Sequence, residues 1–179
     1  MEGIFGGAEI MSFTAFGAIY KATAALLPPA MDTPEAKAMM FAIPMQESRW
    51  DARRQIGGPA RGFPQFEKGT PETRGGITGV LMHPASGPLI RGVLDRLDYD
   101  YKPETSYEAI VHNDVLALAY MRCLLWTLPD PLPRRVESDE AWRQYIEAWR
   151  PGKPKRATWD AFYKQAWEMV GWLPNQHQK

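Results

Sequence analysis

The chain has 179 residues, a length that favours one domain with a buried core. Its 21 Lys and Arg residues balance its 21 Asp and Glu residues, and this zero formal net charge argues against a nucleic-acid binder that relies on overall positive charge. The single cysteine, Cys123, excludes an intramolecular disulfide, and its apolar neighbours are typical of a small buried residue.

The N-terminal part of the chain predicts a helix and no leader. Apolar residues at spacings of three and four favour a mostly buried helix over residues 8–27. Lys21 interrupts its apolar run, which is also too short to span a bilayer. Glu2 and Glu9 precede this first basic residue, so the positively charged start of a signal peptide is missing. We therefore expect no membrane span and a protein made in the cytoplasm.

A second helix is predicted to begin at Pro34, with Thr33 as its N-cap, and to reach Glu47. Pro44 lies inside it, where proline removes a backbone N–H and its ring crowds the preceding turn. Two outcomes are open: the proline kinks the last turn and aims Glu47 into a cleft, or the helix ends early.

The segment after Glu47 and Ser48 contains Gly57-Gly58-Pro59 and then Ala60-Arg61-Gly62-Phe63-Pro64-Gln65-Phe66. Paired glycines beside a proline predict a loop with unusual backbone angles. A carboxylate at a helix end that faces such a loop, with its single Gln65, can form one wall of a polar cleft.

Residues 67–103 are rich in glycine and proline and are long for an unstructured loop in a compact domain. They are predicted to form either a rim that closes over an extended polymer or a mobile surface excursion, with a short helix over 89–97. We call them the glycine-rich region.

The rest of the chain is predicted to be helical, with little strand signal. Thr105 and Glu108 fit a capping box for a helix that continues to Trp126 and breaks near Asn113-Asp114. Leu128–Pro133 is a stiff proline linker. A further helix begins at residues 138–140 and stops after Trp149, Thr158 caps the last helix, and a polar tail follows Pro174. The predicted fold is a single, mainly α domain.

The two linked motifs, Glu47-Ser48 and Pro59-Ala60-Arg61-Gly62-Phe63-Pro64-Gln65, resemble the catalytic region of the soluble lytic transglycosylases, goose-type-lysozyme-like enzymes that cut peptidoglycan. That family has Glu-Ser and then Gly-Ala-x-Gly-Leu-Met-Gln, and the distance of 18 residues from Glu47 to Gln65 fits its spacing. Pro59 and Phe63-Pro64 depart from the family pattern. The resemblance implies a lysozyme-like domain over residues 1–179, with the glycine-rich region following the catalytic helix, and no metal or other cofactor.

The resemblance also implies the chemistry. Glu47 protonates the oxygen of the MurNAc–GlcNAc β-1,4 bond and then, as a carboxylate, takes the proton of the muramic acid 6-hydroxyl, which gives a 1,6-anhydro product. Ser48 orients the acid, and the region of Gln65 and Phe63 lines the cleft. Substrate contacts are also expected from Phe66, Tyr120, Tyr145 and Trp149.

A late motif of the family supplies a tyrosine that hydrogen-bonds the catalytic Glu. Its nearest counterpart here is Ala148-Trp149-Arg150-Pro151-Gly152, in which Trp149 occupies the tyrosine position and lacks the hydroxyl. Arg150 could pair with the carboxylate, but this would lower the pKa of a general acid. Tyr145, one helical turn earlier, can provide a phenol from the same face.

Two other functions compete with the lytic transglycosylase. A muramidase of the same fold would use water and a second carboxylate, with Glu67 favoured over Asp114 and Asp51. A glycan-binding or virion structural module would keep the fold and lack catalysis, which the absent hydroxyl at Trp149 favours. The missing leader and the cell-wall chemistry suggest a bacteriophage protein whose partners are peptidoglycan strands and virion proteins.

Overall fold

Helices provide the regular structure of this chain in a computed structural model that describes residues 11–173. They are α1 (Phe13–Ala24), the 3-10 helix η1 (Pro29–Met31), α2 (Pro34–Glu47), α3 (Gly76–Met82), α4 (Gly87–Arg96), α5 (Pro103–Ala109), α6 (Asp114–Leu125), α7 (Ser138–Trp149) and α8 (Arg156–Trp172). Within residues 11–173 no sheet forms, and the bridges Arg54–Arg61 and Arg61–Phe66 stand alone. The prediction of a mainly α, single compact domain is confirmed.

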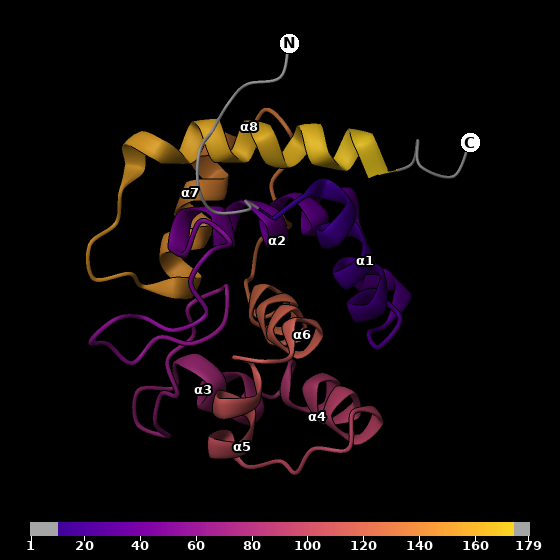
Figure 1. Cartoon of the computed structure of the whole chain (residues 1–179), viewed down its shortest axis with the longest axis vertical. Helices are drawn as coiled ribbons and strands as arrows, with labels where there is room; N and C mark the ends of the chain where they lie inside the picture. Colours follow the sequence, from indigo (N-terminus) through magenta and orange to yellow (C-terminus); the bar gives the residue numbers. More distant parts are fainter. Residues whose placement is uncertain (1–10, 174–179) are drawn as a thin grey trace.

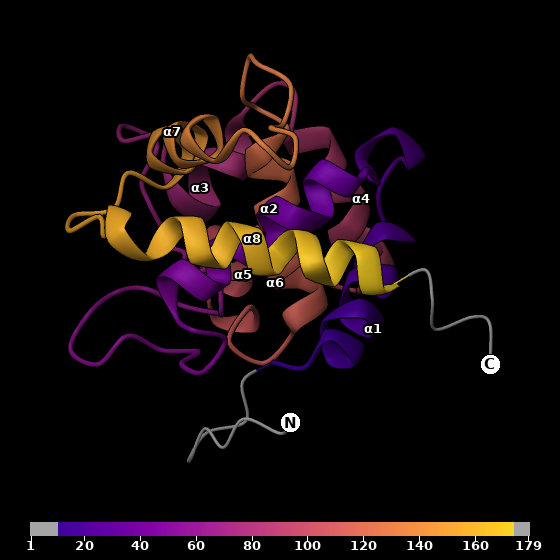
Figure 2. The ribbon, with the colours of Figure 1, turned by 90° about the horizontal axis from the view of Figure 1, so that it is seen from above.

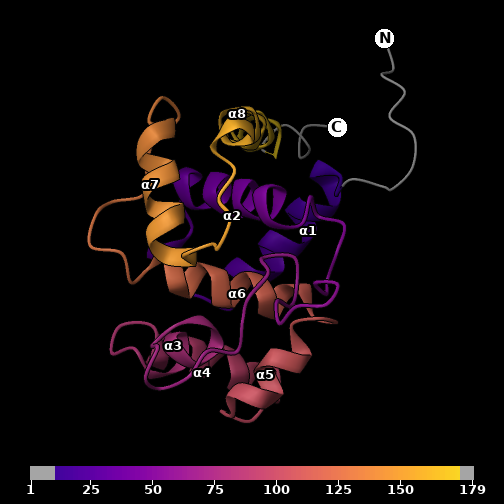
Figure 3. The ribbon, with the colours of Figure 1, turned by 90° about the vertical axis from the view of Figure 1, so that its left-hand side faces the viewer.

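The helices are arranged in layers around α6 (Figures 1 and 3). Above α6 lie α2 and then α8, which runs along α2 in the view from above (Figure 2). The short helices α3, α4 and α5 gather below α6, and α7 stands beside the C-terminal end of α2 (Figure 3). No helix between residues 11 and 173 has the length and apolar character needed to cross a bilayer.

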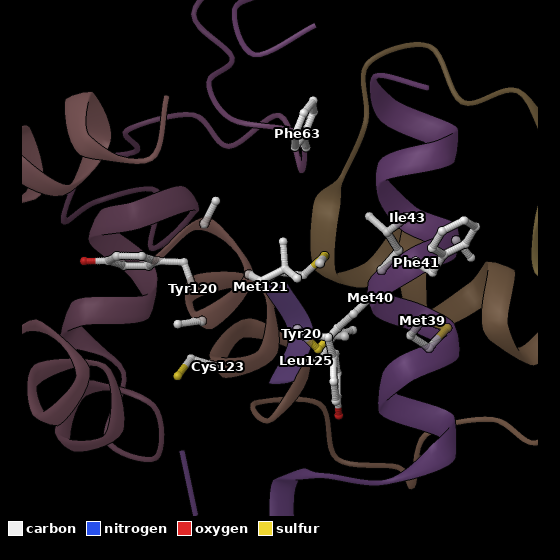
Figure 4. Close-up of a cluster of buried hydrophobic side chains, with 14 of the residues drawn as sticks. Tyr20, Met39, Met40, Phe41, Ile43, Phe63, Tyr120, Met121, Cys123 and Leu125 are labelled. Carbon is white, nitrogen blue, oxygen red and sulfur yellow. The ribbon is translucent and has the colours of Figure 1, made fainter. Parts of the chain in front are cut away.

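The core lies between α2 and α6, and both helices are apolar on nearly all sides. Residues 38–45 of α2 and 116–123 of α6 are buried without a break. A helix that is hydrophobic all round belongs in the interior, because every face must be removed from water. Figure 4 shows side chains of both helices facing one another, with Phe63 of the loop after α2 at one side of the same buried cluster.

The start and end of α2 agree with the sequence prediction. The Thr33 hydroxyl accepts a hydrogen bond from the Ala36 N–H at 3.1 Å, as an N-cap does. The helix passes through Pro44 and ends at Glu47, and the Ser48 N–H donates to the Pro44 carbonyl at 2.9 Å. The alternative of an early end is therefore wrong, and the last turn carries Glu47 beyond the proline.

The glycine-rich region contains two helices, α3 and α4. The predicted helix over 89–97 is confirmed as α4 over Gly87–Arg96, and α3 was not foreseen. Gly69 and Gly76 let the chain fold back on itself before α3. A Cβ on Gly69 would lie 1.9 Å from the Gly75 carbonyl oxygen, and one on Gly76 would lie 2.1 Å from that of Glu67. Both have positive φ, which glycine adopts without strain.

Two of three predicted helix starts are displaced. Thr105 is not a cap, because α5 already begins at Pro103. The break near residue 113 is confirmed, and α6 begins there with Asn113 as its cap, whose side chain accepts the Leu116 N–H at 2.9 Å. Thr158 lies inside α8 and donates its hydroxyl to the Gln46 side-chain oxygen at 3.0 Å. For Thr105 the helix already starts at the proline two residues earlier, and for Thr158 a tertiary partner takes the hydroxyl.

The predicted helix over 8–27 corresponds to α1 over Phe13–Ala24. Residues 8–10 and the tail after Pro174 lie outside the described residues.

Candidate active site around Glu47

A carboxylate and a phenol meet where α2 ends against α7. Glu47, the last residue of α2, is partly buried, and its Oε1 accepts a hydrogen bond from the Tyr145 hydroxyl at 2.6 Å. Tyr145 is itself only 2% exposed. The prediction that Tyr145 supplies a phenol to this face is confirmed, and it makes the contact that Trp149 could not make.

Burial controls the charge of Glu47. Removal from water raises the pKa of the Glu47 carboxyl above its ordinary value, because the charged form loses its hydration. The Tyr145 hydrogen bond works against this and lowers the pKa, but the effect of burial is larger. The possible ion pair between Arg150 and Glu47 does not form: among the described residues, no ion pair joins Glu47 to a Lys or Arg side chain. The acid is therefore biased toward its protonated form.

Ser48 points toward the loop that follows. Its hydroxyl lies 2.8 Å from the Phe63 carbonyl oxygen and 3.2 Å from that of Pro44. These bonds tie the end of α2 to the loop, so any effect of Ser48 on the direction of the Glu47 carboxylate acts through the backbone.

The chain turns back sharply after Ser48. Arg49 and Trp50 both have left-handed backbone angles, with φ of 58° and 57°. The Trp50 ring is buried against Phe41 and Phe63, and its indole N–H donates to the Phe41 carbonyl at 3.2 Å. The indole thus anchors a strained turn directly beside the acid.

The loop that carries Gln65 is held by its own backbone and by side chains. The Arg61 and Phe66 backbones exchange two hydrogen bonds of 2.8 Å. Gln65 has a φ of 54°, and its side-chain NH2 donates to the Gly62 carbonyl at 2.8 Å and to the Ala52 carbonyl at 3.2 Å. The amide nitrogen is thus used to shape the loop.

Trp149 also contacts this loop. Its indole N–H donates to the Pro64 carbonyl at 2.8 Å. Its partly buried ring lies 5.6 Å from the Phe66 ring and 6.4 Å from the Tyr145 ring, centre to centre. Trp149 and Tyr145 therefore extend from one face of α7, the first to the loop and the second to Glu47.

The chain matches no known family model, no curated protein and no solved structure. Its chemistry therefore has to be inferred from its own side chains.

Besides Tyr145, three aromatic residues expected to contact substrate are inside the protein. Phe63 and Phe66 are each 3% exposed, and Tyr120 is fully buried. Phe63 packs between Trp50 and the Arg53 guanidinium, which lies 4.1 Å from the ring centre. The Tyr120 hydroxyl donates to Ser106 at 2.6 Å, and in Figure 4 this side chain points away from α2. In this conformation none of the three offers surface to a sugar, whereas Glu47, Ser48, Gln65 and Trp149 are partly accessible.

The candidate second carboxylates are engaged or exposed. Asp114 receives two hydrogen bonds from the Arg53 guanidinium, at 3.1 and 2.7 Å. Asp51 and Glu67 lie on the exposed surface. No His, Cys, Asp and Glu side chains between residues 11 and 173 form a group of three or more that could hold a metal ion.

A groove of about 760 Å³ lies elsewhere on the molecule, between α1, the start of α2 and the end of α8. None of the predicted site residues lines it. The chemistry of Glu47 and the shape of this groove are thus separate features.

The sequence did contain a signal for the α7 face. Tyr145 and Trp149 are four residues apart, so a helix places them on the same side. The hydrogen bonds from Ser48 and Trp149 to the loop carbonyls had no such signal, because they depend on how the loop packs.

Proposed function

We propose that this chain is a peptidoglycan-cleaving lytic transglycosylase of lysozyme-like fold in which Glu47 is the catalytic residue. The observation that carries the proposal is the partly buried Glu47 carboxyl, held by the Tyr145 hydroxyl at 2.6 Å beside the loop with the Gln65 motif. The family resemblance supplies the substrate class, and the geometry supplies a group suited to acid and base chemistry.

Glycosidic cleavage requires a proton on the leaving oxygen. A carboxylic acid kept neutral by burial can deliver that proton, which is the direction in which burial shifts Glu47. As the bond between C1 of the muramic acid and the bridging oxygen breaks, the Glu47 proton passes to that oxygen. The carboxylate that remains accepts the hydrogen bond from Tyr145, which stabilises the negative charge.

The same carboxylate then completes the reaction. It takes the proton of the 6-hydroxyl while that oxygen forms a bond to C1, so the sugar closes on itself and Glu47 returns to its neutral state. No water is consumed. A single group with a pKa raised by burial and moderated by one hydrogen bond suits both steps.

A one-carboxylate mechanism also agrees with the surroundings. A hydrolase of this kind needs a second carboxylate, yet Asp114 is paired with Arg53 and Glu67 is exposed. We therefore favour the anhydro-forming reaction over the muramidase.

The experiment is digestion of purified cell wall with mass analysis of the released fragments. Wild type, Glu47→Gln and the control Glu168→Gln, an exposed acid of α8, are compared side by side. Anhydro ends from wild type and from the control, with none from Glu47→Gln, are the expected result.

Other results separate the alternatives. Reducing ends that disappear in Glu67→Gln or Asp114→Asn identify a muramidase. Wall binding without fragments, unchanged in Glu47→Gln, identifies a glycan-binding module and rejects the enzyme.

A further inference from the structure

Three consecutive carbonyl groups of the loop each accept a hydrogen bond from a different side chain. The Gly62 carbonyl is bound by the Gln65 side chain, that of Phe63 by the Ser48 hydroxyl and that of Pro64 by the Trp149 indole, each at 2.8 Å. Loops normally satisfy such groups with water or with their own backbone, and of these three the Gly62 carbonyl also accepts the Gln65 backbone N–H at 3.0 Å. Here two of the three donors come from outside the loop, one from the end of α2 and one from α7.

The two outside donors stand next to the Glu47–Tyr145 pair. Ser48 follows Glu47 in the chain, and Trp149 is one helical turn after Tyr145 on α7. The contacts therefore form a closed circuit. It runs from Glu47 to the Tyr145 hydroxyl, along α7 to Trp149, through its indole to the loop, and back through Ser48 to Glu47.

The loop has reason to need these ties. Gly62 and Gln65, only three residues apart, are both left-handed, with φ of 67° and 54°. Pro64, which lies between them, has no N–H to offer a neighbouring segment. The backbone N–H groups of Gly62 and Gln65 are bonded, but none of the described backbone hydrogen bonds ends on the Phe63 or the Pro64 carbonyl, so these two groups depend on side-chain donors.

We propose that Trp149 is a positioning residue. Through the hydrogen bond from its indole N–H to the Pro64 carbonyl, it keeps the 62–66 loop closed beside Glu47. It thereby couples the closure of the loop to the protonation of Glu47. The role in catalysis rests on the proposed function, whereas the coupling itself does not. The Trp149 ring packs on both Phe66 and Tyr145, so the same side chain contacts the loop and the partner of the acid.

The coupling has a definite sign. If the indole bond is lost, the loop loosens and water reaches Glu47. Burial is the cause of the raised pKa, so added water lowers the pKa of Glu47 toward its ordinary value. Glu47 thus becomes a stronger acid, and it loses its proton at a lower pH than in the wild type.

Trp149→Phe tests this, because phenylalanine keeps a ring against Phe66 and Tyr145 and removes the N–H. Trp142→Phe is the matched control: it lies on the same helix, and its ring is 5.3 Å from that of Tyr145, but its described contacts are with rings and the Arg156 guanidinium. The Glu47 carboxyl is titrated by NMR in protein labelled with 13C-glutamate, and the signal is assigned by its absence in Glu47→Gln.

The expected result is a lower pKa of Glu47 in Trp149→Phe and the wild-type pKa in Trp142→Phe. In the wall-cleavage assay, kcat/KM of Trp149→Phe should fall by about tenfold, the loss expected for one hydrogen bond, and the limb of its pH profile that reports Glu47 should move to lower pH. Trp142→Phe should keep the wild-type profile.

Ser48→Ala provides a second, independent variant, since it removes the other outside tie to the loop, and it decides the matter if Trp149→Phe does not fold. A folded variant with an unchanged Glu47 titration overturns the coupling. A shifted titration in a protein that releases no wall fragments keeps the coupling and rejects the proposed function, so the two failures are distinguishable.

Discussion

Replacing Tyr145 by Phe removes the hydrogen bond to Glu47 and leaves the ring in place. The ring is stacked on Trp159 at 5.1 Å with 13° between the planes, so phenylalanine can keep this packing. A hydrogen bond to a charged group contributes about 1.5–3 kcal/mol and one between neutral groups about 0.5–1.5 kcal/mol. Tyr145→Phe should therefore lose more free energy of stabilisation at a pH at which Glu47 is ionised than at a pH at which it is protonated.

The variant also changes the acid itself. The Tyr145 hydroxyl lowers the pKa of Glu47 because it donates to the carboxylate, so its removal should raise that pKa further. If the carboxylate is formed during cleavage, the loss of about 1.5–3 kcal/mol corresponds to a rate lower by about 10- to 150-fold. The two effects together predict slower cleavage and a pH profile moved to higher pH, opposite in direction to Trp149→Phe.

A double-mutant cycle isolates the pair without any activity assay. Urea unfolding of wild type, Tyr145→Phe, Glu47→Ala and the double variant yields the coupling free energy. We expect about 1.5–3 kcal/mol above the raised pKa of Glu47 and about 0.5–1.5 kcal/mol at a pH at which it is protonated.

Tyr163→Phe is the control in the cycle. It is also a buried tyrosine, but its hydroxyl donates to the Pro133 and Arg134 carbonyls, at 2.8 and 2.9 Å. Its effect should add to that of Glu47→Ala within about 0.5 kcal/mol. A Tyr145–Glu47 coupling that is no larger than this, at either pH, would refute the reasoning.

Two further predictions concern the charges at the site. Because the folded-state pKa of Glu47 is raised, the folded protein binds the proton more tightly than the unfolded chain, so stability falls as pH rises from the ordinary glutamate pKa through the folded-state value. Glu47→Gln should lack this dependence and should be the more stable protein above that pH range, by about 1.4 kcal/mol for each tenfold difference in proton affinity between the folded and the unfolded chain. Thermal unfolding of both proteins across pH checks this. Stability curves that run parallel for the two proteins contradict it. Asp114→Asn should cost at most about 1 kcal/mol, because its partner Arg53 is partly exposed, with 43% of its side chain accessible, and should leave wall cleavage at the wild-type rate. A folded Asp114→Asn protein without cleavage would instead point to a second carboxylate.

The parts of the fold that could be predicted from sequence are those set by local chemistry. Thr33, Pro34 and the apolar run after them predict α2 over the bounds that the structure has. Local chemistry failed where a partner from elsewhere intervened. Thr158, expected to be a cap, has its hydroxyl 3.0 Å from Gln46 of α2 and lies inside α8. The many glycines before α3 hid that helix, because they serve the tight turn that precedes it.

The candidate site was likewise predictable only where the local helical repeat determines it. Tyr145 could be expected to reach Glu47, since the helical repeat places it on the face of α7 that also carries Trp149. The loop residues were different, because a short motif does not tell which of its side chains turn inward. The Phe63 and Phe66 side chains pack into the core. Ser48 and Trp149 instead bind backbone carbonyls of the loop, those of Phe63 and Pro64.

Four of the six non-glycine residues with left-handed backbone angles in residues 11–173 lie around the candidate site, and the other two, Arg74 and Asp98, lie before α3 and after α4. Arg49 and Trp50 follow Ser48, Gln65 lies in the loop and Arg150 follows Trp149, and all four are left-handed at positions where glycine would cost nothing. Such conformations cost about 1–3 kcal/mol each and persist only where surrounding contacts impose them. Burial of the Trp50 ring can offset about 1.5–3 kcal/mol of this, but Arg49 and Arg150 are exposed and gain no such burial. Local contacts account for two of these positions: the Arg49 guanidinium lies 4.3 Å from the Phe162 ring centre, and Arg150 is the left-handed C-cap of α7, where such angles are common. The three segments that carry the four residues, which are the end of α2, the loop and the end of α7, are the ones that Ser48 and Trp149 join beside Glu47.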